Sequence, residues 1–155
     1  MEEIEKALEA EHEELKFPGF GFEDALAIGM DLVEEGRKKG LPIAIDVTVN
    51  RQQLFHAALP GSTPDNDQWI RRKSRVAERF NKSSFSVAQR FRGAKGTLQE
   101  NGLPDAEYAL SGGSFPVMIR GAGAIGTVTV SGLPDHEDHR MVVEAMRRHL
   151  ARRKA

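Results

Sequence analysis

Two stretches of alternating apolar and polar residues predict β-hairpins in this chain. In the later stretch, the runs Phe115–Arg120 and Ile125–Ser131 flank a short glycine-rich connection. Within the second run, Val128 and Val130 fall on one face and Thr127 lies opposite, as expected for a strand with one face packed on helices. We expect the rest of the chain to be organised around this hairpin.

The earlier hairpin is predicted between residues 42 and 59. Pro42–Val49 alternates isoleucine and valine with smaller or polar residues, Asn50–Gln52 has the composition of a turn, and Gln53–Leu59 returns as the second strand. His56 should then point away from the apolar face that Phe55 helps to form. An isolated histidine at such a position is more often an ordinary surface or interface residue than a ligand.

Apolar residues at helical spacing predict five helices around the hairpins. Their ranges are 2–15, 22–39, 64–80, 83–94 and 134–152. The first is strongly acidic and is expected to be peripheral. The second carries Phe22 and Leu26 on its apolar side, with Gly40 as its C-terminal cap. The third should begin at Thr63 and Pro64, a capping residue followed by the residue favoured at the first helical position.

These elements predict an α/β fold of the α+β type, with a mainly antiparallel sheet built from two hairpins and helices on its faces. At 155 residues the chain should form one domain, 1–155. A formal net charge of −1 argues against a nucleic-acid surface, and the absence of cysteine excludes disulfides and thiolate chemistry. The acidic start and the lack of a long apolar run predict a cytoplasmic protein with no membrane partner.

The segment Gly121–Gly126 matches the GxGxxG pattern of dinucleotide-binding proteins letter for letter. That pattern binds a pyrophosphate only where a helix begins within it. Here β-branched residues follow, with the sequence Thr-Val-Thr-Val from Thr127. We therefore interpret the glycines as a hairpin turn and expect no binding of NAD or FAD.

The only tryptophan, Trp69, stands beside a dense run of cations that includes Arg72 and Lys73. One interpretation makes Trp69 a packing anchor and the cations a solvated face. The other is an anion site, in which Arg72 or Lys73 meets a carboxylate or phosphate and Trp69 covers an aromatic ring.

Two histidines, His136 and His139, lie three residues apart at the start of the last predicted helix. They are weak candidates for a metal site, because two nitrogens need further ligands from elsewhere, and we expect no metal. His139 follows Asp138 and is the best candidate for a pH-sensitive site. We expect it to donate a hydrogen bond to a carboxylate or backbone oxygen. Alternatively, Asp138 caps the helix and His139 packs at a subunit boundary.

Several motifs together resemble the GlcG/HbpS haem-degrading-domain superfamily. They are Gly112-Gly113-Ser114-Phe-Pro-Val, Gly121-x-Gly-x-Ile-Gly-Thr-Val-Thr-Val-Ser-Gly-Leu-Pro134, Asp138-His139 and Pro60-Gly-x-x-Pro-Asp-Asn-x-x-Trp69-Ile-x-x-Lys73. The resemblance covers nearly the whole chain and is closest to a branch of cytoplasmic members, for which no reaction is implied. It implies haem or corrinoid as a possible ligand and ring-like or stacked homo-oligomers.

The sequence thus favours a homo-oligomeric protein that binds a small anionic or tetrapyrrole-like ligand. The candidate contacts are Trp69, Arg72, Lys73, Gly112, Gly113, Ser114 and His139. The alternative is a non-catalytic scaffold or partner-binding protein, in which the same residues build interfaces. A third possibility is an enzyme that depends on a bound cofactor, since no nucleophile–base pair stands out. Self-association is expected through the helix that carries Trp69 and through the final helix.

Overall fold

A five-stranded sheet in the order β1-β4-β5-β2-β3 forms the centre of the computed structural model. The structure describes residues 2–94 and 96–154; Met1, Lys95 and Ala155, which belong to the expected domain 1–155, lie outside the described residues. The strands are β1 (Lys16–Phe17), β2 (Ala44–Val49), β3 (Gln52–Ala58), β4 (Ser114–Ile119) and β5 (Ala124–Ser131). β1 pairs with β4 in parallel and the other neighbouring pairs are antiparallel, so the sheet is mixed. The predicted α+β fold with a mainly antiparallel sheet is confirmed.

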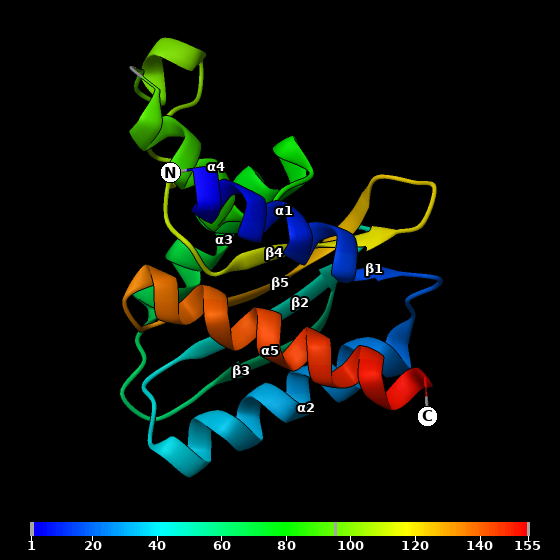
Figure 1. The fold of residues 1–155 in the computed structure, drawn as a ribbon. Helices are drawn as coiled ribbons and strands as arrows, with labels where there is room; N and C mark the ends of the chain where they lie inside the picture. Colours follow the sequence, from blue (N-terminus) through cyan, green and yellow to red (C-terminus); the bar gives the residue numbers. More distant parts are fainter. Residues whose placement is uncertain (1, 95, 155) are drawn as a thin grey trace.

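Helices cover both faces of this sheet (Figure 1). They are α1 (Glu2–Glu14), α2 (Phe22–Lys39), α3 (Pro64–Phe80), α4 (Ser84–Gly93) and α5 (Asp135–Lys154), with a short 3₁₀ helix η1 (Gln99–Asn101). α2 and α5 pack together on one face, where the apolar core lies, and α3 lies across the other (Figure 1). Among the described residues, none of the helices combines the length and the apolar content that a membrane span requires.

The two faces of the sheet differ in chemistry, as the alternation along the strands predicted. Ile45, Val47, Val128 and Val130 are fully buried beneath α2 and α5. The opposite face carries hydroxyl and carboxylate groups, and Thr127 is fully buried there. Because buried polar groups need hydrogen-bond partners, the polar side chains of this second face are better candidates for a functional site than the apolar side chains of the first.

The hairpin turns lie where the sequence placed them. Gly121 has a φ of +79° in the β4–β5 turn, and β5 continues directly from Ala124, so no helix begins within the GxGxxG segment. The β2–β3 turn has positive φ at both Asn50 (+52°) and Arg51 (+68°). Two successive residues with positive φ match the right-handed twist of the flanking strands, and here neither is glycine.

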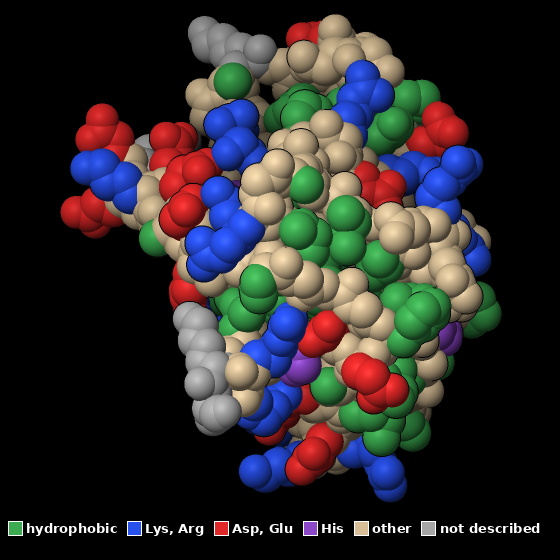
Figure 2. Space-filling view, turned by 90° about the vertical axis from the view of Figure 1, so that its right-hand side faces the viewer, with side chains coloured by type: hydrophobic (Ala, Val, Ile, Leu, Met, Phe, Trp, Pro, Cys, Tyr) green, Lys and Arg blue, Asp and Glu red, His purple; other side chains and the backbone are tan. Residues whose placement is uncertain are grey.

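The predicted apolar side of α2 is wrong at its N-terminal end. Phe22 and Leu26 leave 68% and 47% of their surface exposed, while Ile28 and Leu32 are fully buried. The helix carries two adjacent apolar stripes, and only the one through Ile28 and Leu32 faces the sheet. Seen from the side of the β4–β5 turn, apolar patches alternate with acidic and basic side chains on the surface (Figure 2).

Candidate functional site

A pocket of about 270 Å³ lies between the N-terminal half of α3 and the connection from β5 to α5. Two of the predicted site residues, Trp69 and Lys73, line it together. The full set of lining residues is Asp65, Asn66, Trp69, Lys73, Ser111, Ser131, Gly132, Leu133 and Asp138. Trp69 and Lys73 are adjacent because residues four positions apart share one side of a helix.

An ion pair between Lys73 and Asp138 forms the buried part of this pocket. The Lys73 Nζ donates to Asp138 Oδ2 at 2.9 Å and to the carbonyl oxygen of Val130 at 3.1 Å. Both side chains are almost fully buried, with 3% and 1% of their surfaces exposed. Asp138 Oδ1 accepts a hydrogen bond from the backbone N–H of Leu133 at 3.0 Å. The assignment of Lys73 to a solvated cationic patch is therefore wrong: its position on α3 faces the sheet.

Burial acts on both members of this pair. It lowers the pKa of Lys73, and the Asp138 carboxylate opposes that shift. Burial likewise raises the pKa of Asp138, and the Lys73 ammonium opposes that shift. Each charge is therefore retained largely because the other is present. An ammonium has three N–H donors, and the described protein atoms accept only two from Lys73, which leaves one for a ligand in the pocket.

The Gly112-Gly113-Ser114 segment is not among the residues that line the pocket, but its Gly113 lies directly against Lys73 and Asp138. Gly113 has a φ of +131°, and a Cβ there would lie 2.5 Å from the Val130 carbonyl oxygen and 2.7 Å from Lys73 Nζ. Only glycine can therefore occupy this position without moving the ammonium. Ser114 is fully buried, where it accepts a hydrogen bond from the Thr129 hydroxyl at 2.9 Å.

Arg72 covers Trp69 instead of lining the pocket. Its guanidinium carbon lies 4.7 Å from the centre of the indole ring, a cation–π distance. Its Nε donates to the carbonyl oxygen of Asp105 at 3.0 Å. Arg72 thus links Trp69 to the loop that contains Asp105. Of the two predicted anion-binding cations, only Lys73 lines the pocket.

His139 lies in a different place, between α5 and α1. Its Nε2 is 2.8 Å from Glu11 Oε1, and its ring stacks on Phe85 with the ring centres 4.9 Å apart. The expected hydrogen bond to a carboxylate is present, although the carboxylate comes from α1 instead of from a neighbour in sequence. His136 is exposed, and the described residues contain no cluster of three or more potential metal ligands.

Asp138 lines the pocket but was not among the predicted site residues; the sequence suggested a capping role for it only as an alternative. Ser111 and Ser131 also line the pocket without having been predicted. One signal for Asp138 was available: Lys73 falls on the same side of its helix as Trp69 and Val76, which are apolar. A lysine on a buried face requires a buried carboxylate or carbonyl partner.

The chain is similar to several known proteins. Residues 20–147 match the family model described as "Haem degrading protein HbpS-like". A UPF0303 protein of Streptomyces avermitilis is 51% identical over 146 residues, which cover 94% of this chain and 90% of the relative. Among solved structures, that of the Ybr137w protein has a TM-score of 0.88 at 28% identity, covering 97% of this chain and 90% of the other. The PduOC:haem complex has a TM-score of 0.69 at 14% identity, covering 84% and 94%, and shares the fold.

Proposed function

Because this chain belongs to the HbpS-like family, we propose that it binds a small ligand in the pocket beside Trp69 and Lys73. One observation carries the proposal: a buried ammonium with an unused N–H lies in a pocket that also has an indole wall. Such a pairing of one apolar ring with a few polar groups is typical of small-molecule sites. The role of the site is binding.

The charges of the pocket restrict the chemistry of the ligand. Asp138 already balances Lys73, so a neutral carbonyl or amide oxygen can accept the remaining N–H without adding charge. A carboxylate would add a negative charge unless Asp138 takes up a proton, and burial raises the pKa of Asp138 in that direction. We therefore propose a ligand with an aromatic or planar ring for Trp69 and a carboxylate or amide arm for Lys73.

The residues of this pocket do not fit haem or a corrinoid as a whole. Iron in haem proteins is held by histidine, cysteine, methionine or tyrosine, and none of the described lining residues is of these types. The pocket volume of about 270 Å³ is also below the usual range of about 300–1,000 Å³ for drug-sized ligands. A carboxylate arm of a tetrapyrrole fits beside Lys73, whereas the macrocycle does not.

Intrinsic fluorescence tests the proposal directly, because Trp69 is the only tryptophan. We expect benzoate and benzamide to quench or shift Trp69 emission saturably, and Lys73→Met to abolish this response. Since Lys73→Met alone leaves Asp138 buried without its partner, Lys73→Met/Asp138→Leu serves as the folded variant lacking the pair. Arg147→Gln, at an exposed ion pair with Glu14, is the matched control.

Two results would contradict the proposed site. The first is an emission response of the same size and midpoint in wild type and in both Lys73 variants. The second comes from a parallel titration with haemin, in which the Soret band is followed. A Soret shift that is lost in the Lys73 variants would make a tetrapyrrole the ligand, contrary to the fit described above.

A further inference from the structure

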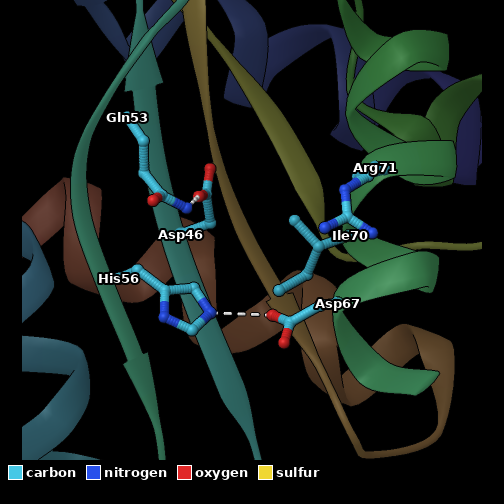
Figure 3. Close-up of a pocket in the computed structure, with 6 residues that line it drawn as sticks. All are labelled: Asp46, Gln53, His56, Asp67, Ile70 and Arg71. Carbon is cyan, nitrogen blue, oxygen red and sulfur yellow. Dashed lines mark hydrogen bonds and ion pairs between the residues drawn. The ribbon is translucent and has the colours of Figure 1, made fainter. Parts of the chain in front are cut away.

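A second hollow lies on the opposite flank of α3, between this helix and the polar face of β2 and β3 (Figure 3). It consists of two adjoining pockets of about 260 Å³ and 500 Å³, which share Asp46, Gln53, Ile70 and Arg71. At one end, His56 Nε2 and Asp67 Oδ1 join β3 to α3 at 2.7 Å (Figure 3). We call the larger pocket the arginine groove. The lining residues that carry the argument are Asp46, Arg51, Arg71, Arg75, Glu78 and Thr127.

Three guanidinium groups line the arginine groove. Arg71 and Arg75 are four residues apart and share one side of α3, and Arg51 comes from the β2–β3 turn. No described residue forms a hydrogen bond or ion pair with the Arg71 guanidinium, whereas Arg75 donates only to the Glu107 carbonyl oxygen at 3.3 Å. Arg51 has a φ of +68°, a conformation that is costly for a residue with a long side chain.

The groove has two carboxyl groups for its three guanidinium groups, and among the described residues neither carboxyl group forms an ion pair with them. Both oxygens of Asp46 are occupied by neutral donors, Thr48 Oγ1 and Gln53 Nε2, each at 2.7 Å. Burial raises the pKa of Glu78, and the nearby Arg75 and Arg51 guanidinium groups oppose that shift. Three guanidinium groups thus face two carboxyl groups, and Arg71 in particular retains its hydrogen-bonding capacity.

An unpartnered hydroxyl provides an independent sign of a ligand. Thr127 on β5 is fully buried and lines the groove, and its Oγ1 has no hydrogen-bond partner among the described residues. A buried hydroxyl without a partner is unfavourable, and native proteins rarely retain one without a reason. A ligand oxygen at this place would accept from Thr127 and remove that cost.

From this arrangement we infer that the arginine groove binds a phosphate monoester. The phosphate would lie among Arg51, Arg71 and Arg75, since guanidinium groups hold phosphate oxygens through paired hydrogen bonds. The organic part would extend along Ile70 toward the Thr127 hydroxyl. The volume of about 500 Å³ suits a small molecule, and the net charge of −1 argues against nucleic acid as the source of the phosphate.

Calorimetric titration with phenyl phosphate tests this inference on the intact chain. We expect saturable binding that is weakened about 10-fold or more by Arg71→Gln, because one hydrogen-bonded charge is lost. Thr127→Val, which replaces the hydroxyl by a methyl of similar shape, should weaken binding several-fold while the fold is kept. Arg37→Gln, on α2 at the other face of the sheet, is the matched control and should bind as wild type does.

Three results would overturn the inference. They are no saturation up to about 10 mM phenyl phosphate, equal affinities in Arg71→Gln and Arg37→Gln, and affinity for inorganic phosphate as high as for the monoester. The last would show that the groove does not contact the organic part. Lys73 and Trp69 are unchanged in every variant, and Arg71 lines only the groove, so the comparison of Arg71→Gln with Arg37→Gln separates this inference from the function proposed for the pocket on the other flank of α3.

Discussion

Lys73 of α3 and Asp138 of α5 are separated by 65 positions in the sequence, yet their charged groups meet at 2.9 Å with both side chains buried. Lys73 also bonds to Val130 on β5, and Asp138 to the backbone of Leu133. The pair therefore joins a helix on one face of the sheet to the start of the helix on the other, at the edge of the candidate pocket.

The first prediction concerns the stability that this pair contributes. Asp138→Asn should lower the free energy of unfolding by about 3–5 kcal/mol, because it leaves the Lys73 ammonium buried without its counter-charge. Lys73→Met/Asp138→Leu should restore much of that loss, since no charge then remains buried. Urea unfolding of the three proteins measures both effects. If Asp138→Asn were as stable as wild type, the pair would be solvated in solution.

The second prediction concerns acid stability and His12 on α1. Burial lowers the pKa of His12 from 6.5 to about 4. Its Nε2 accepts a hydrogen bond from the backbone N–H of Ser83 at 2.8 Å, so its proton resides on Nδ1. Between pH 6.5 and about 4 the unfolded chain binds a proton that the folded chain does not. Stability should therefore fall as the pH decreases through this window, by up to about 1.4 kcal/mol per pH unit.

The matched variant for this effect is His12→Gln, whose side-chain oxygen can still accept from Ser83 but does not titrate. We expect its stability to decrease less steeply than that of wild type between pH 6.5 and about 4, as followed by urea unfolding. His136→Gln, at an exposed histidine, should keep the wild-type slope. Parallel slopes for wild type and His12→Gln would rule out His12 as the cause.

The third prediction concerns the attachment of α1 through His139. His139→Ala removes both the hydrogen bond to Glu11 and the stacking on Phe85. We expect a loss of about 1–3 kcal/mol and faster amide exchange in α1, whereas His136→Ala should stay within about 0.5 kcal/mol of wild type. If instead His139 lies at a subunit boundary, as the sequence suggested, the size-exclusion profile of His139→Ala should change while amide exchange in α1 does not.

The fourth prediction concerns self-association, which was expected through the Trp69 helix and the final helix. Of the four large apolar side chains that are exposed among the described residues, three lie instead on α2, where Phe22, Leu26 and Met30 form one stripe with exposed fractions of 68%, 47% and 55%. Sedimentation at micromolar concentration should show several subunits, and Leu26→Lys should reduce their number. Ile4→Lys, at an exposed apolar residue of α1, is the control. A wild-type monomer would exclude the oligomer itself.

Local patterns were sufficient to predict most of the fold. α2 and α3 begin at the expected residues. Thr63 and Pro64 are strong signals for the start of α3, and Gly40 ends α2 with a φ of +64°. β1 could not be predicted, since two residues, Lys16 and Phe17, show no periodicity. The Lys73–Asp138 pair was also missed: the helix pattern shows that Lys73 is buried, but its partner lies 65 positions away and no local pattern identifies it.

The position of α3 between two pockets has a consequence for any pair of molecules that occupies them. Lys73 on one flank and Arg71 on the other are two residues apart on the same helix. A compound that displaces this helix from either side must therefore alter the geometry offered to the second compound. Thermodynamic linkage then requires the influence to be reciprocal: each compound changes the affinity for the other by the same factor. Because α3 lines both pockets, binding of a compound in one pocket would change the affinity of the other pocket for its own compound.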